Sequence, residues 1–338
     1  LSDGKGNPHL GPHILAGVNG SGKSTVLKTI AWVLAREGDG FDAQEWKQCL
    51  EGHDRWFAEL IFKNPQGGNM ISRPLEYRPS ASLSARGTLH APFEGSLRSF
   101  YPFAAYAPST RLKYLVNPDI TKSPSSPFEN ALAFGDTVQN ELVQSWLVGL
   151  LIKPGLARDL NRAAEEYSQA LARFESALRL IYGDKLRLLP ELKPGLHPRL
   201  QVGNQSLNFS QIPDGIRATL GWLADFMMRQ DLMQWDPRLN GKRPGLLLLD
   251  EIDAHLHPQW QRTLLPAIRK ALPDVQIIVT SHSPFVISSC PGSRVHVFGT
   301  DESGRASLRQ SCDAPVGESI TTTLMGILSS LDVLRNKP

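Results

Sequence analysis

The spacing of hydrophobic positions changes along the chain between the short runs typical of strands and the three-to-four-residue period typical of helices. Apolar runs bounded by turn residues predict strands at 13–16, 56–62, 70–77, 100–106, 245–249 and 275–280. The last two runs are apolar on both faces, as are central strands that are covered by helices on each side. We therefore expect a parallel sheet near the C-terminal half.

Helical spacing is clearest in four stretches, at about 22–37, 129–185, 214–229 and 258–271. The second stretch predicts an amphipathic helical hairpin that packs on a core, because a long coiled-coil arm needs three to four clean heptads and this stretch is short for such an arm. Residues 107–128 carry four prolines and several serines, which is typical of a connector. Pro266 is expected to kink the last helix.

Strands and helices that alternate in this way predict an α/β fold with a mostly parallel sheet flanked by helices. The hairpin interrupts this pattern, so we expect a helical insertion lobe. We predict an N-terminal part of the core at 1–117, the insertion lobe at 118–194 and a C-terminal part of the core at 195–338.

The composition limits the classes of function. A net charge of +3 is only mildly basic, so it neither requires nor excludes nucleic acid as a partner. The three cysteines are widely spaced and form no zinc motif, which favours a reducing compartment. The sequence shows neither a secretory leader nor an apolar run of the roughly 18 residues that span a bilayer. We expect a cytoplasmic protein without a membrane partner.

The clearest motif lies between the first strand and the first helix. Residues 17–25 read GVNGSGKST and match the pattern GxxxxGK[ST]. Glycines let the backbone curl so that successive N–H groups point at phosphate oxygens, and the helix N-terminus adds a positive dipole end. Lys23 is expected to reach the β- and γ-phosphates, and Ser24 to bind Mg²⁺ through its hydroxyl. The predicted nucleotide-binding residues of this loop are Asn19, Gly20, Ser21, Gly22, Lys23, Ser24 and Thr25.

A pair of carboxylates follows the apolar strand 245–249. Asp250 is predicted to bind Mg²⁺, directly or through water, and Glu251 to polarise the attacking water. The next strand ends in TSHS, and parallel strands end on the same edge of the sheet. His282 is therefore expected on the γ-phosphate side of the site, although a histidine there is also compatible with a structural hydrogen bond.

Together these motifs resemble the ABC-type ATPases, the class that includes transporter nucleotide-binding domains and RecF/SMC-like DNA repair ATPases. That class carries a signature loop ahead of a helix, and the matching place here is Ile212-Pro213-Asp214-Gly215. The resemblance implies that Asp214 and Gly215 contact the γ-phosphate held by a second subunit, giving a head-to-tail dimer around two ATP molecules. Pro213 stands where a serine is usual, so this chain lacks one hydroxyl donor there.

Within that class, DEIDAHLHP at 250–258, TSHSP at 280–284 and FSQIPDGIRATLGWLADF at 209–226 are similar to the OLD, Septu and retron-associated phage-defence ATPases. By this resemblance residues 254–257 form the loop that crosses the dimer interface. A metal site at Asp253, His255 and His257 is an alternative explanation of the same segment. The glutamine loop of the class has no counterpart near 106–111, where Arg111 is either a residue near the nucleotide or an ordinary surface arginine.

These resemblances imply an ATPase that uses ATP and Mg²⁺, dimerises or forms a higher oligomer, and controls a nuclease or another nucleic-acid-acting partner in prokaryotic anti-phage defence. Residues 286–338 are too few for the nuclease domain that follows the ATPase in OLD proteins, so we expect nuclease chemistry from a partner. Three alternatives remain: a RecF/SMC-type DNA repair ATPase, a transporter nucleotide-binding subunit and a nucleotide-locked scaffold.

Overall fold

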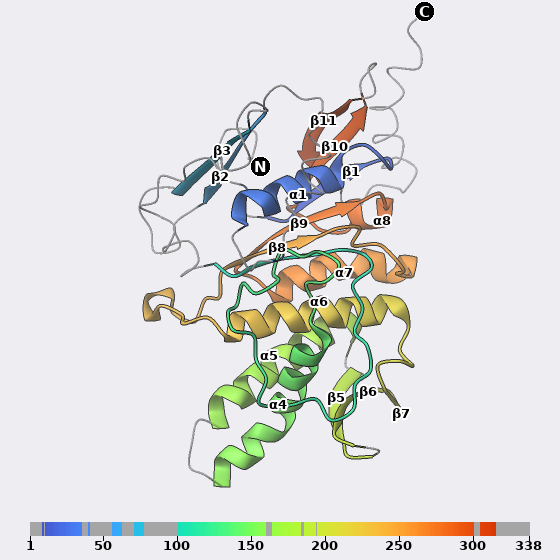
Figure 1. The fold of residues 1–338 in the computed structure, drawn as a ribbon. Helices are drawn as coiled ribbons and strands as arrows, with labels where there is room; N and C mark the ends of the chain where they lie inside the picture. The colour runs from blue at the N-terminus through green and yellow to red at the C-terminus, as the bar shows by residue number, and fades with distance from the viewer. Residues whose placement is uncertain are drawn as a thin grey trace, which may run out of the picture.

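A computed structural model describes residues 9, 11–35, 40, 56–62, 71–77, 101–159, 164–183, 186–193, 195–300 and 305–315. Figure 1 shows a central sheet between helical layers, with a helical lobe below it. Among the described residues, no helix is long and apolar enough to cross a membrane.

The central sheet has six strands in the order β11-β10-β1-β9-β8-β4. Their bounds are β1 (His13–Gly17), β4 (Phe103–Tyr106), β8 (Gly245–Leu249), β9 (Val275–Ser281), β10 (Arg294–Thr300) and β11 (Ala306–Asp313). Every neighbouring pair is parallel except β10 and β11, which are antiparallel. The expectation of a mostly parallel sheet is confirmed, whereas the sequence patterns did not predict β10 and β11.

Helices cover both faces of this sheet (Figure 1). Helix α1 (Lys23–Leu34) packs on one face, where Leu246 and Leu248 of β8 belong to its hydrophobic cluster. Helices α6 (Asp214–Asp231) and α7 (Pro258–Ala271) pack on the other face, against Leu247 and Leu249. Alternate side chains of β8 are therefore buried on opposite sides, which explains why its sequence is apolar without interruption. The short helices α8 (Pro284–Ile287) and η1 (Pro237–Leu239) complete this part of the fold.

The helical lobe contains the expected hairpin, formed by α4 (Asn140–Asp159) and α5 (Ala164–Tyr182). The helix does not begin near residue 129 as predicted, because Asn130 and Phe134 have positive φ angles of 50° and 52° that no α-helix contains. Beside the hairpin lies an unexpected antiparallel sheet of β5 (Leu186–Glu191), β6 (His197–Val202) and β7 (Gln205–Leu207), of which β6 and β7 follow the predicted end of the lobe at residue 194.

A separate antiparallel pair, β2 (Trp56–Phe62) and β3 (Ile71–Tyr77), matches two of the predicted strands to within one residue. The predicted strand at 100–106 is shorter than expected and begins at Phe103. Residues 107–128 contain neither a helix nor a strand, as expected of a proline-rich connector.

Candidate functional site

The loop between β1 and α1 is built for a close approach of its backbone to a ligand. Gly20 and Gly22 have φ angles of 78° and 88°, in the left-handed region that favours glycine. A Cβ atom on Gly17 would lie 2.3 Å from the carbonyl oxygen of Phe298. Gly22 caps α1 without a side-chain hydrogen bond, so the first N–H groups of the helix have no capping side chain. The loop thus offers backbone donors at a helix N-terminus, the arrangement that binds phosphate.

Lys23 lies across this loop. Its Nζ atom donates hydrogen bonds to the carbonyl oxygens of Gly17 and Val18, both at 2.9 Å. Burial lowers the pKa of Lys23, while Glu251, Asp250 and Asp253 act in the opposite direction, with the effect of Glu251 the largest. The carboxylates after β8 therefore favour the charged form of Lys23, whose hydrogen bonds go to the loop itself.

Asp250 connects three elements at the edge of the sheet. Its Oδ1 atom accepts hydrogen bonds from the Ser24 hydroxyl of α1 at 2.9 Å and from the Thr280 hydroxyl of β9 at 2.6 Å. Its backbone N–H donates to the carbonyl oxygen of Tyr106 in β4 at 2.9 Å. The two predicted magnesium ligands, Ser24 and Asp250, are thus in direct contact.

This donor set fits Mg²⁺. The ion prefers oxygen ligands, keeps several waters and is commonly held by one or two protein oxygens together with substrate phosphates. The Ser24 hydroxyl and the Asp250 carboxylate supply such oxygens beside the phosphate loop. The described residues contain no group of three or more His, Cys, Asp or Glu side chains able to hold a metal, so the alternative site at Asp253, His255 and His257 is not formed.

Glu251 follows in a tight turn. Its φ angle is 48°, and its backbone N–H donates to the Thr280 hydroxyl at 2.7 Å. Its carboxylate has no hydrogen-bond partner within the described part of the chain and is therefore available to a water molecule. Thr280 thus contacts both residues of the acidic pair, a role that the sequence analysis missed. The only signal for it is its place at the end of a buried strand.

His282 lies at the same edge, and its side chain is 54% exposed. Its Nε2 atom is 3.4 Å from Oδ2 of Asp253, whereas Oδ1 of Asp253 is buried without a hydrogen-bond partner. The imidazole is thus placed next to the turn after Glu251, with one face open to solvent. His282 thus contacts Asp253 within the chain, and its exposed part is accessible to a ligand.

Asp214 and Gly215 begin α6, on the side of the sheet opposite to α1. A Cβ atom on Gly215 would lie 2.6 Å from the carbonyl oxygen of His255, so only glycine lets α6 pack this closely on the turn after Glu251. Asp214 forms an ion pair with Arg217, which lowers the pKa of Asp214, and Arg111 adds to this effect. These residues therefore form a charged patch beside the acidic turn rather than over the chain's own phosphate loop.

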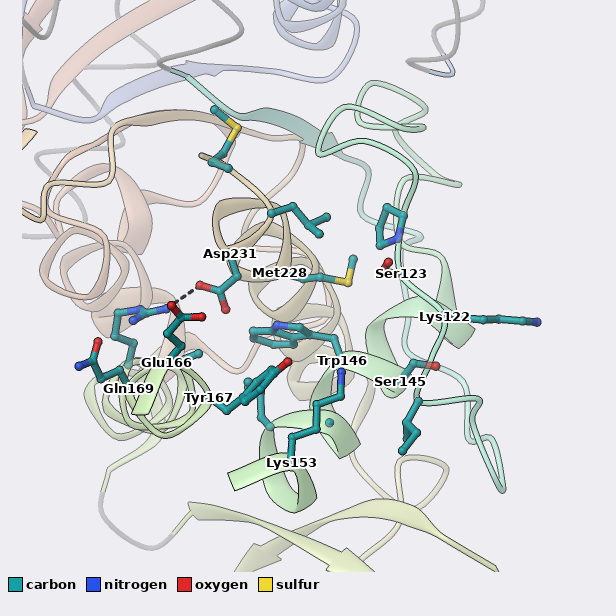
Figure 2. Close-up of a pocket in the computed structure, with 18 of the residues that line it drawn as sticks. Lys122, Ser123, Ser145, Trp146, Lys153, Glu166, Tyr167, Gln169, Met228 and Asp231 are labelled. Carbon is teal, nitrogen blue, oxygen red and sulfur yellow. Dashed lines mark hydrogen bonds and ion pairs between the residues drawn. The ribbon is translucent and has the colours of Figure 1, made fainter. Parts of the chain in front are cut away.

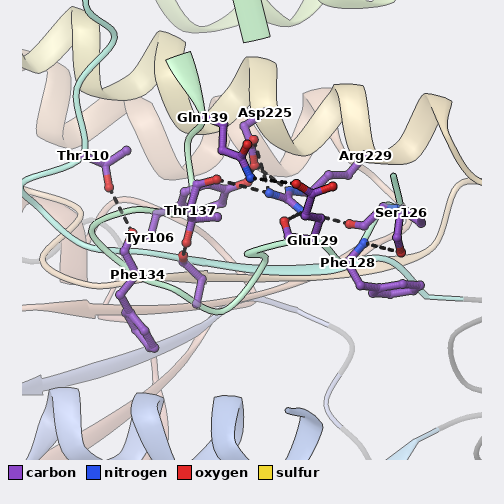
Figure 3. Close-up of polar contacts among 12 residues, drawn as sticks. Tyr106, Thr110, Ser126, Phe128, Glu129, Phe134, Thr137, Gln139, Asp225 and Arg229 are labelled. Carbon is purple, nitrogen blue, oxygen red and sulfur yellow. Dashed lines mark hydrogen bonds and ion pairs between the residues drawn. The ribbon is translucent and has the colours of Figure 1, made fainter. Parts of the chain in front are cut away.

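A buried polar network lies behind the site and was not predicted (Figure 3). Asp225 and Arg229 of α6 form an ion pair with a nitrogen–oxygen distance of 2.6 Å, and the side chains are 0% and 1% exposed. The Tyr106 hydroxyl donates to Asp225 at 2.6 Å. Arg229 also donates to the carbonyl oxygens of Pro127, Glu129 and Thr137. The network joins α6 to the connector and to the strand whose last carbonyl holds Asp250.

A second buried polar pair lies at the opposite end of β1. Nδ1 of His13 is 2.9 Å from Nε2 of His296 on β10, and Nδ1 of His296 contacts the Ser311 hydroxyl at 2.8 Å. Burial, followed by the neighbouring His296, lowers the pKa of His13 to about 3, and burial lowers that of His296 to about 4. Both rings are neutral at physiological pH, and their contact links the first residue of β1 to the third residue of β10, its parallel neighbour.

The chain is similar to one protein family over about half of its length. Residues 117–288 match a family model described as "AAA domain, putative AbiEii toxin, Type IV TA system". The range covers residues 117–128 of the connector, the helical lobe, α6, and β8 with Asp250 and Glu251 directly after it. The matched residues make up slightly more than half of the chain.

Two curated relatives share shorter segments. The Retron Ec83 probable ATPase of Escherichia coli is 32% identical over 103 residues, which are 30% of this chain and 19% of that protein. The Septu protein PtuA of Bacillus thuringiensis is 37% identical over 89 residues, which are 25% of this chain and 22% of that protein. The chain thus matches less than a quarter of the length of either relative.

Among solved structures, an SmcHead bound to the C-winged helix domain of ScpA superimposes with a TM-score of 0.53. The sequences are 17% identical, and the match covers 90% of each chain. This likeness shows the fold, an α/β P-loop ATPase fold of the type found in SMC heads, as the resemblance of the motifs implied.

Proposed function

The chain belongs to the AAA domain family described as a putative AbiEii toxin of type IV toxin–antitoxin systems, and from this premise we propose that it binds ATP with Mg²⁺ and hydrolyses it. One observation carries the proposal: five side chains from α1, β9 and the turn after β8 converge at one edge of the sheet. They are Lys23, Ser24, Asp250, Glu251 and Thr280.

Each group has a role that follows from its position. The backbone N–H groups of the loop and the Lys23 ammonium bind the phosphates, and Ser24 and Asp250 would hold Mg²⁺. When bound, the ion neutralises charge that develops on the phosphate oxygens. Glu251 orients and polarises the attacking water, because its carboxylate is free of other partners in the described residues. The Thr280 hydroxyl fixes the position of the Glu251 backbone relative to the Asp250 carboxylate, because it is hydrogen-bonded to both.

We further propose that ATP closes a head-to-tail dimer. Asp214 and Gly215 lie at the same edge as the acidic turn, but α6 and α1 cover opposite faces of the sheet. A second copy, turned by a two-fold axis, would bring this helix N-terminus to the γ-phosphate, where its positive dipole end favours negative charge. His282, next to Asp253, would contact the same phosphate.

We propose that this ATP-dependent dimer controls a nuclease or another effector in prokaryotic anti-phage defence. The retron and Septu names of the two relatives support this assignment. The hairpin of α4 and α5 has helices of 20 and 19 residues rather than a long coiled coil, which does not favour a role in chromosome maintenance.

Light scattering combined with a phosphate-release assay tests this proposal on the wild type and on Glu251→Gln. We expect the wild type to release phosphate, and Glu251→Gln to double its mass only with ATP and Mg²⁺ while releasing almost none. Lys23→Ala is the control that should neither hydrolyse nor associate. If the mass of Glu251→Gln stays unchanged, the dimer proposal is wrong, and if the wild type and Glu251→Gln release phosphate equally, Glu251 is not the residue that activates water.

A further inference from the structure

A cavity of about 490 Å³ opens in the helical lobe, between α4, α5, the end of α6 and the connector (Figure 2). This volume lies in the range of about 300–1,000 Å³ that is typical of sites for small ligands. The cavity lies at the Asp231 end of α6, whereas Asp214 and Gly215 mark the other end of that helix. Eighteen residues of helix separate these ends by roughly 27 Å, so the cavity is distinct from the nucleotide site.

One side of the cavity is aromatic and keeps unused donors. Trp146 of α4 and Tyr167 of α5 both line it (Figure 2). Within the described part of the chain, neither the indole N–H nor the phenol O–H has a hydrogen-bond acceptor. The Trp146 ring also packs against Phe174 in a T-shaped contact, with the ring centroids 5.5 Å apart. A rigid aromatic wall of this kind suits a flat ring.

The charges that line the cavity are unbalanced. Four cationic side chains line it, namely Lys122, Lys153, Arg173 and Arg243. The two acidic side chains are Glu166 and Asp231. Arg173 and Arg243 both donate to the same oxygen, Oδ1 of Asp231, at 2.5 and 2.6 Å. Two guanidinium groups therefore share one carboxylate oxygen. Burial lowers the pKa of Arg173, Asp231 raises it and Arg243 lowers it, which reflects the repulsion between the two guanidinium groups.

Lys153 adds a positive charge at the aromatic wall. Its Nζ atom lies 5.3 Å from the centroid of the Tyr167 ring, and it has no acidic partner among the described residues. The other cavity lysine, Lys122, is already paired with Glu141 at 2.7 Å. An anionic group that entered the cavity would find in Lys153 a cation whose one partner among the described residues is the Tyr167 ring.

We propose that this cavity binds a small aromatic anion of mononucleotide size, with its ring on Trp146 and Tyr167 and its anionic group beside Lys153, Arg173 and Arg243. An apolar ligand would leave Lys153 without an acidic partner among the described residues, and a simple inorganic anion would leave the aromatic wall uncovered. A nucleoside monophosphate combines both features. This inference does not depend on hydrolysis at the nucleotide site.

Calorimetric titration of AMP into the Lys23→Ala protein tests the proposal, because that background weakens binding at the phosphate loop. We expect one AMP site, and binding at least about fivefold weaker for adenosine and for inorganic phosphate. Lys153→Gln should weaken AMP binding by about fivefold or more, and Tyr167→Leu should weaken it further for AMP than for phosphate. Lys270→Gln, the same charge change at an exposed position of α7, is the matched control and should leave the affinity within about twofold.

Three results of the AMP titrations would overturn the proposal, and a fourth comes from an oligonucleotide. They are the absence of AMP binding at millimolar concentration, equal affinity for AMP and adenosine, and equal effects of Lys153→Gln and Lys270→Gln. Tighter, Lys153-dependent binding of a single-stranded oligonucleotide than of AMP would assign the cavity to nucleic acid and would also overturn it. Urea unfolding of each variant shows that it is folded, and Lys153→Gln, which removes no core side chain, keeps the test independent of the aromatic variant.

Discussion

Thr280 is the residue whose replacement tests the geometry of the site most directly. Its hydroxyl accepts a hydrogen bond from the backbone N–H of Glu251 and donates one to Asp250, and the side chain is fully buried. Thr280→Val keeps the shape of the side chain but removes both hydrogen bonds. An N–H group left without an acceptor in such a place costs about 1–3 kcal/mol.

We expect this loss to appear mainly in the catalytic step. The change leaves Lys23, the proposed phosphate-binding lysine, untouched, so KM should vary by less than about threefold. Since about 1.4 kcal/mol corresponds to a factor of ten in rate, kcat should fall roughly 10- to 100-fold. The free energy of unfolding should fall by about 1–3 kcal/mol. Steady-state phosphate release gives kcat and KM, and urea unfolding gives the stability.

Thr280→Ser is the matched control because it retains the hydroxyl and removes only a methyl group. Its unfolding free energy should fall by about 1 kcal/mol, whereas its kcat should stay within about threefold of the wild type. If both variants lose the same activity, Thr280 acts through packing and not through its hydrogen bonds. A Thr280→Val protein with the kcat of the wild type would refute the positioning role altogether.

Three further predictions concern buried or tightly packed groups. Arg229→Met leaves the Asp225 carboxylate buried without its cation, so urea titrations should show an unfolding free energy lower by about 3–5 kcal/mol. A loss below about 1 kcal/mol would contradict this account. Gly215→Ala should weaken ATP-dependent dimerisation at least about tenfold in light scattering while nucleotide binding persists, because its Cβ would lie 2.6 Å from a backbone oxygen. His13 and His296 have pKa values of about 3 and 4 in the folded chain against 6.5 in the unfolded chain, so they bind fewer protons when folded. The free energy of unfolding should therefore be constant above pH 7 and fall as the pH drops below 6.5. The loss should reach about 2 kcal/mol for each ring at pH 5. The double change of both histidines to Gln should remove most of that slope, and an unchanged slope would count against the neutral pair.

The sequence was most informative where local chemistry and periodicity agree. The place of the glycine-rich loop between β1 and α1 was predictable because glycines, a lysine and a hydroxyl occur there at fixed spacing after an apolar run and before a helical pattern. The apolar run of β8 indicated a strand covered on both faces, and Leu247 and Leu248 indeed belong to different clusters. Asp250 was predictable for the same reason, since it directly follows that strand.

Other features depend on contacts between distant residues and leave little trace in local patterns. Thr280 and Asp250 meet only because β8 and β9 are parallel neighbours. The pairing of Asp225 and Arg229 looks like an ordinary helical ion pair until Tyr106 and the connector bury it. β5 has only partial alternation and follows an amphipathic helix, so the antiparallel sheet of the lobe could not be distinguished from the end of the hairpin.

Helix α6 is the element through which the proposed activities would influence one another. Its first turn packs on the acidic turn at Gly215. Its last turn holds the connector through Arg229 and binds the two cavity arginines through Asp231. A ligand in the cavity can shift the proposed dimer equilibrium only if it binds the open and closed states with different affinities. Because Asp231 and Gly215 belong to one helix, any rotation of α6 on ATP binding would displace the arginines relative to Trp146 and create such a difference. AMP affinity measured on Glu251→Gln with and without ATP therefore tests the coupling, and equal affinities in the two states would show that the two sites act independently.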